Sequence, residues 1–308
     1  MSGVRHLLLA TVAAVLALAL GLALGAGPVV SRSDATRASR DERLAARTAR
    51  LEARLARLED GARTDARVVA ALAGPMTDNR LDGHSVLIVR TQGASDALVR
   101  RTRAALLGAN ASLTGELTIT GTYLDPAKAT APLEDLALRL VPPNMTFAPG
   151  STPIERVGAV LARSTIAKEP GDEPDQDGAE VIAGLHELGA VRLDGTPGRQ
   201  AELAVVLTGP RERPSAQAAV TALVQALDAA GAGAVLAGPG RAPVAVGWLR
   251  SVDTGGASSV DSADSPAGEV SLVLALVEQL AGGKGAYGAG GGATAVLPAS
   301  VLSSPASG

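Results

Sequence analysis

The sequence of 308 residues contains no cysteine. This absence excludes disulfide bonds, thiolate zinc sites and cysteine nucleophiles, and it leaves the redox compartment undetermined. Aromatic residues make up only 1% of the chain, so its core must be built from Val, Leu, Ala and Ile. The net charge of -3 lacks the strongly basic balance of a nucleic-acid-binding domain. We therefore expect no nucleic-acid partner.

Common catalytic motifs are also missing. The sequence has no G-x-S-x-G elbow and no Walker A motif. Gly283, Gly285 and Gly288 match G-x-G-x-x-G, but they follow a predicted helix instead of the strand that a dinucleotide site requires. We therefore predict that the protein is not an enzyme and has no cofactor. An enzyme that uses arginine-bearing loops of the body is the alternative.

Side chains that bind transition metals are few and scattered. Soft metal ions prefer thiolates and thioethers, and borderline ions also accept imidazoles. The candidate metal ligands beyond the N-terminal region are His84, His186, Met76 and Met145. A structural or surface role for the two histidines is the alternative, and tight metal capture is not expected from so sparse a set.

Residues 7–30 form a long uncharged run. At about 1.5 Å per residue, a helix of this length crosses a hydrocarbon core of ~30 Å. We predict a transmembrane anchor over residues 1–30, in which Gly21 and Gly25 form a small-xxx-small contact pair. A cleaved signal peptide is the alternative. The arginines on either side leave the membrane orientation undecided.

Residues 31–75 are predicted to form a coiled-coil helix. Leu44, Leu51 and Leu58 repeat every seven residues, and Leu55 lies at the other seam position. Two chains in one membrane would raise each other's effective concentration, so self-association through this seam is expected. The alternative is a lone amphipathic helix that packs on its own body.

The rest of the chain alternates strands and helices. Apolar runs such as residues 85–89 and 203–208 are typical of strands covered on both faces of a parallel sheet. We predict an α/β fold with a mostly parallel sheet covered by helices. The predicted segments are a first α/β half (82–167), an acidic linker (168–178), a second α/β half (179–284) and a flexible Gly/Ala/Ser tail (285–308).

Two strand ends carry arginines. Val206–Pro210 precedes Arg211 and Arg213, and the similar 235–239 segment precedes Arg241. Ligands of open parallel sheets usually lie at the carboxyl ends of strands. These arginines are therefore candidates for an anion-binding site. Simple Gly-Pro turns before the next helix are the alternative.

Taken in order, these segments resemble the actinobacterial copper-transport MctB family. The resemblance covers nearly the whole chain except about the last twenty residues. Its most distinctive pieces are the strand region 85–91, the segment Ser259-Val260-Asp261-Ser262-Ala263-Asp264, Ala267-Gly268-Glu269, the run 272–276 and the segment 283–288.

The resemblance implies an envelope protein of copper homeostasis that moves copper across the outer membrane through a pore-like channel. It implies a copper ion as the transported species and a lipid bilayer as a partner. A membrane-anchored coiled-coil scaffold of the cell envelope, without enzymatic activity, is the alternative function.

Overall fold

The computed structural model describes residues 40, 42–141, 145–171, 173–240 and 243–298. By its internal contacts the chain divides into two compact units, residues 1–65 and 66–308. The predicted anchor, with Gly21 and Gly25, lies outside the described residues. Within the described ranges, no helix combines the length and hydropathy needed to cross a bilayer.

Residues 42–77 are helical, in agreement with the helix predicted over most of this region. The leucines of the predicted seam point into solvent: Leu44, Leu51, Leu55 and Leu58 are 53–61% exposed. A leucine left this exposed gives up the roughly 1.5–3 kcal/mol that its burial would contribute. The helix therefore carries an apolar row that its own unit does not cover.

The second unit is built on a seven-stranded sheet with the order β3-β2-β1-β4-β5-β6-β7. All neighbours are parallel except β2 and β3, which are antiparallel. The mostly parallel sheet predicted from the sequence is confirmed. The strands are β1 (Ser85–Thr91), β2 (Ser112–Ile119), β3 (Val191–Gly195), β4 (Leu203–Leu207), β5 (Gly233–Ala237), β6 (Ser258–Val260) and β7 (Ala286–Tyr287).

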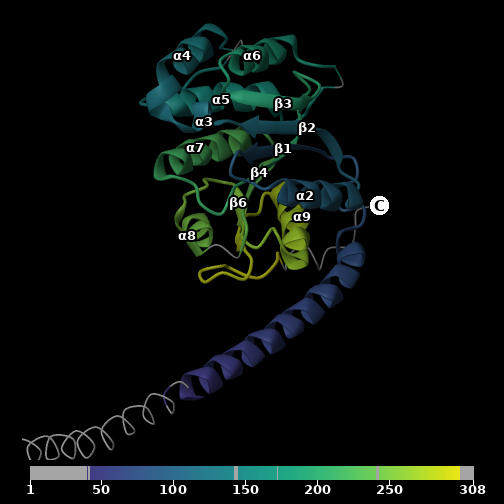
Figure 1. The fold of residues 1–308 in the computed structure, drawn as a ribbon. Coiled ribbons are helices and arrows are strands. Elements are labelled where there is room, and N and C mark those ends of the chain that lie inside the picture. Colours follow the sequence, from purple (N-terminus) through teal and green to yellow (C-terminus); the bar gives the residue numbers. More distant parts are fainter. Residues whose placement is uncertain (1–39, 41, 142–144, 172, 241–242, 299–308) are drawn as a thin grey trace, which may run out of the picture. The chain divides into compact units, whose positions relative to one another are not determined.

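Helices cover both faces of this sheet (Figure 1). One face packs against α3, α4, α5, α6, α7 and α8, and the other packs against α2 and α9. The helices are α2 (Asp96–Gly108), α3 (Gly121–Leu124), α4 (Pro126–Arg139), α5 (Pro153–Thr165), α6 (Gln176–Glu187), α7 (Pro214–Ala230), α8 (Pro243–Ser251) and α9 (Pro266–Leu280).

The strand sequences explain the two cores. In β1, Leu87 and Val89 face the α5–α7 side, whereas Val86 and Ile88 face the α2–α9 side. Because successive strand side chains alternate between faces, a strand covered on both sides must be apolar throughout. β4 and β5 follow the same rule and are buried along their whole length.

Capping groups fix where the covering helices begin. The Ser95 hydroxyl accepts a hydrogen bond from the Leu98 amide at the start of α2. Thr152 and Glu155 form a reciprocal capping box at the start of α5. Such caps satisfy backbone N–H groups that the first turn leaves without intrahelical partners.

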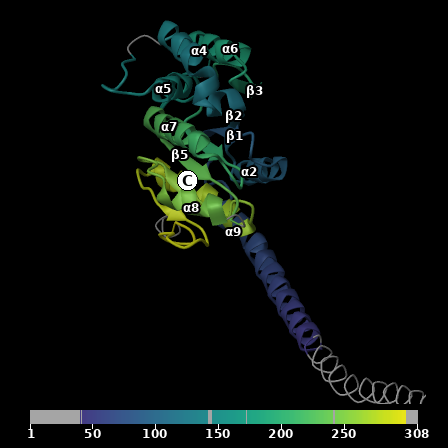
Figure 2. The same ribbon diagram turned by 60° about the vertical axis from the view of Figure 1, so that its left-hand side comes forward.

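Several elements differ from the sequence prediction. The acidic linker of 168–178 ends earlier than expected, because α6 begins at Gln176 with Asp175 as its N-cap. Helix α8 and strand β6 were not predicted, since both are short. Ala286 and Tyr287 were assigned to the flexible tail, but they form the edge strand β7. Figure 2 shows α8 and α9 at the end of the sheet opposite α4 and α6.

Candidate functional site

The carboxyl ends of β1 and β4 form the point where the strand order reverses. From β1 the chain crosses through α2 on one face, and from β4 it crosses through α7 on the other. In open α/β sheets, ligands bind most often in the crevice at such a switch point. The loops after these two strands are therefore the first place to examine for a site.

A carboxylate occupies this crevice. Oε1 of Glu212 accepts hydrogen bonds from the Thr91 hydroxyl at 2.6 Å and from the Gly209 amide at 2.9 Å. A Cβ on Gly209 would collide with the carbonyl group of Gly93, so the two loops touch through glycine backbone. The crevice between β1 and β4 is consequently closed by the protein itself.

The arginines predicted to bind a ligand here are not all brought together. Arg211 is exposed on the loop after β4, and Arg213 is the N-cap residue of α7. Arg241 lies outside the described residues. Helix α7 begins at Pro214 and α8 at Pro243, so each Gly-Pro segment is followed within a few residues by a helix.

Arg213 and His186 instead line one pocket of about 550 Å³ beside β2 and β3. His186 comes from the last turn of α6, and Arg213 comes from the start of α7. The sequence named both residues but did not place them together. Their proximity depends on β3 pairing antiparallel with β2, which brings the end of α6 to the carboxyl edge of the sheet.

The other candidate metal ligands are separated. Nδ1 of His84 lies 2.7 Å from Oε2 of Glu202, so this imidazole already has a carboxylate partner. Met145 packs against the core on the α5–α7 side, and Met76 is partly buried near the end of the 42–77 helix. Within the described ranges, no group of three or more His, Asp or Glu residues is placed to hold a metal ion.

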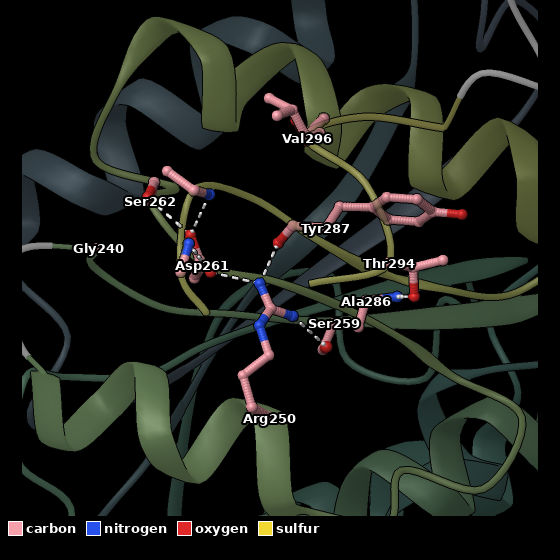
Figure 3. Close-up of polar contacts among 12 residues, drawn as sticks. Gly240, Arg250, Ser259, Asp261, Ser262, Ala286, Tyr287, Thr294 and Val296 are labelled. Atoms are coloured by element: carbon pink, nitrogen blue, oxygen red, sulfur yellow. Dashed lines mark hydrogen bonds and ion pairs between the residues drawn. The ribbon is translucent and has the colours of Figure 1, made fainter. Parts of the chain in front are cut away.

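A second polar centre lies at the carboxyl end of β6 and was not foreseen as a site (Figure 3). Asp261 is fully buried and pairs with Arg250, which reaches it from α8 and is only 8% exposed. The Arg250 guanidinium also donates to the Tyr287 carbonyl oxygen at 2.6 Å. This arrangement joins α8, β6 and β7 through one ion pair.

Asp261 also holds the loop that follows β7. Its carboxylate accepts hydrogen bonds from the Ala289 amide and the Gly290 amide, each at 2.9 Å, and from the Ser262 hydroxyl at 2.7 Å. A Cβ on Gly288 would collide with this carboxylate. The glycines after β7 are therefore needed so that backbone can approach Asp261 closely.

These contacts decide the charge state of Asp261. Burial alone would raise its pKa, but hydrogen bonds from Ser262 and Gly290 and the charge of Arg250 outweigh burial and lower the pKa below its usual value. Asp261 is therefore ionised at neutral pH. A buried carboxylate with four donors acts as a structural clamp, because its lone pairs are already engaged.

The turn beyond Asp261 opens a smaller pocket of about 280 Å³ at the start of α9. Ser262 adopts a positive φ of 59°, and its carbonyl accepts the Ser265 amide at 2.8 Å. A Cβ on Gly268 would collide with that carbonyl. Asp264 accepts the Gly240 amide at 2.9 Å, so its carboxylate ties the β5 loop to the β6 loop.

Part of this centre could be recognised in the sequence. The segment Ser259–Asp264 belongs to the most distinctive part of the family resemblance, but the role of Asp261 depends on its partner Arg250. Arg250 lies on a helix that the sequence did not predict, and Gly288 and Gly290 lie in the predicted tail. Because the three segments are separated in the chain, no local sequence pattern indicates that they meet.

The fold and its two polar centres define a doubly wound α/β domain that follows a long helix. The family model described as "Copper transport outer membrane protein, MctB" matches residues 1–298. The chain belongs to this family. A curated relative, "Copper transporter MctB" of Mycobacterium leprae (strain TN), is 27% identical over 245 residues, which cover 73% of this chain and 76% of the relative.

Proposed function

We propose that this protein serves copper transport and copper homeostasis at the cell envelope, as a non-enzymatic component of copper efflux. The observation that carries the proposal is the family match, which spans both the helical region and the α/β body. The name of the Mycobacterium leprae relative supports the same role.

The distribution of donors favours passage of copper over its storage. The sequence has no cysteine, and its methionines number three. His84 is engaged by Glu202, and Met145 is packed against the core. Because Cu(I) is held tightly by clustered soft ligands, a protein with isolated donors is better suited to transient contact with the ion.

The uncharged run of residues 7–30 supports attachment to a lipid bilayer as a transmembrane anchor. In this proposal the anchors of several chains assemble, with Gly21 and Gly25 at the helix contact, and form the copper path across the outer membrane. The α/β body then stands in the aqueous phase beside that path.

The test is a deletion strain grown at graded external copper. The proposal predicts that cell-associated copper, measured by mass spectrometry, rises in the deletion strain and returns to normal when the wild-type chain is restored. Cell-associated zinc is the control and should not change. Equal copper in the deletion and parent strains would reject the efflux role.

The exposed leucine seam of residues 44–58 favours a second function, that of a coiled-coil scaffold of the envelope. A scaffold requires self-association but no effect on copper. The deletion strain separates the two functions, because a scaffold predicts altered envelope assembly together with unchanged cellular copper.

A further inference from the structure

The pocket beside β2 and β3 has the position and size of a ligand site. It lies where β1 and β2 end and β3 begins, next to the closed crevice of Glu212. Its volume of about 550 Å³ lies within the ~300–1,000 Å³ typical of small-molecule sites. The pocket is therefore one strand away from the β1–β4 crevice, at the same edge of the sheet.

Three basic side chains from separate segments line the pocket, and all three are exposed. They are His186 of α6, Arg192 of β3 and Arg213 at the start of α7. The side chains of Arg192 and Arg213 form no hydrogen bond or ion pair with any described residue. The described lining includes neither Asp nor Glu, and the adjacent carboxylate of Glu212 is bonded to Thr91 and Gly209 instead of to an arginine.

Two polar residues of the lining already have partners within the protein. The Thr120 hydroxyl donates to the Gly189 carbonyl oxygen at 2.5 Å, and Oε1 of Gln92 accepts the Gly121 amide at 3.0 Å. The two arginines of the lining are therefore its charged groups that are available to a ligand.

Helix α7 begins next to the pocket. It is 17 residues long, and its N-cap residue Arg213, which lines the pocket, makes no side-chain capping bond. The positive end of the helix dipole therefore adds to the charge of Arg213 and favours a bound anion. The dipole alone would not identify a ligand, but it supports the two arginines that line the pocket.

We propose that this pocket binds a small soluble phosphate-bearing ligand, with Arg192 and Arg213 as its charged clamps and His186 as a further donor. A phosphate fits better than a monocarboxylate, because a carboxylate is saturated by one bidentate arginine whereas phosphate offers more acceptor oxygens. The site is independent of the copper path, and no copper donor role is assigned to it.

The experiment titrates the full-length chain, purified in a phosphate-free detergent, by calorimetry. The probes are inorganic phosphate, adenosine monophosphate and acetate. We expect saturable binding of the first two and none of acetate. Saturable binding of acetate as tight as that of phosphate would overturn the ligand assignment, and no saturable phosphate binding up to about 10 mM would overturn the site.

The test variant is the double substitution Arg192→Gln with Arg213→Gln. The matched control is Arg199→Gln with Arg211→Gln, which removes the same charge from exposed arginines outside the pocket. We expect the test variant to weaken phosphate binding at least about tenfold and the control to weaken it less than about twofold. Equal weakening in both would mean that phosphate responds only to net charge, and the proposal would fail.

Thermal melting without phosphate checks that both variants fold. If the test variant is unfolded, the single variants Arg192→Gln and Arg213→Gln are titrated instead, and each is expected to weaken binding. Retention of wild-type affinity in both single variants would equally overturn the site.

Discussion

Arg250 and Asp261 form an ion pair inside the α/β body, where Asp261 is fully buried and Arg250 is 8% exposed. The pair links α8 to the end of β6. Arg250 also binds the backbone of β7, and Asp261 binds the backbone of the segment that follows β7. The β6–β7 edge of the sheet is therefore held together by a charge network as well as by apolar contacts.

Asp261→Asn is expected to destabilise the body by about 3–5 kcal/mol, because it leaves the buried guanidinium without its counter-charge. Chemical denaturation at neutral pH measures the change in the free energy of unfolding. The matched control is Asp194→Asn on the exposed edge strand β3, which should change the free energy by less than about 0.5 kcal/mol. Similar small effects for both variants would show that the pair does not stabilise the fold.

The same residue predicts how stability depends on pH. Because the folded-state pKa of Asp261 lies below its unfolded value, its contribution is fully present above the unfolded pKa of about 3.9. The contribution is lost as the pH falls through the lower folded-state pKa. Denaturation curves between neutral and acid pH should therefore fall more steeply for the wild-type chain than for Asp261→Asn. If the stability of both proteins fell in parallel with pH, Asp261 would not be the source of this pH dependence.

The two tyrosines are expected to respond oppositely to removal of their hydroxyl groups. Burial raises the pKa of Tyr123, and its hydroxyl has no partner among the described residues. Tyr123→Phe removes an unsatisfied polar group and should stabilise the body by about 1 kcal/mol. The Tyr287 hydroxyl donates to Glu278, so Tyr287→Phe should destabilise it by about 1–2 kcal/mol.

Thermal melting of the two Tyr→Phe variants compares their stabilities, and the same hydroxyl group is removed in both. A loss of stability in Tyr123→Phe equal to that in Tyr287→Phe would mean that the Tyr123 hydroxyl is paired. Burial and Glu278 both raise the pKa of Tyr287, so the Tyr287–Glu278 contact should persist across neutral pH.

The leucine seam predicts self-association. Replacing Leu51 and Leu58 with serine removes two exposed seam residues and should reduce cross-linked dimer in membranes about tenfold. The control is Leu107→Ser on α2, a leucine that is 55% exposed but lies outside the seam. Unchanged cross-linking in the seam variant, or a purely monomeric wild-type chain, would reject association through this helix.

The sequence predicted the alternation of strands and helices well where apolar runs were long. Residues 85–89 and 203–208 correspond to β1 and β4, because strands buried on both faces have few polar positions to interrupt them. The antiparallel pairing of β3 was not predicted, since edge pairing direction depends on the path of the preceding helices.

The candidate sites were predictable only in part. Arg213 and His186 were recognised as chemically useful residues, but their shared pocket required the three-dimensional pairing of β2 with β3. Predicting the Asp261 centre would have required predicting α8, which has nine residues, and β7, which has two. Elements this short show too little periodicity to be recognised in the sequence.

The most direct test of the copper role is the rate at which preloaded cells release radioactive copper into copper-free medium. The release rate reports efflux alone, whereas total cellular copper depends on both uptake and efflux. The account predicts slow release from the deletion strain and normal release after the wild-type chain is restored. Equal release rates from deletion, restored and parent strains would contradict a role in copper transport.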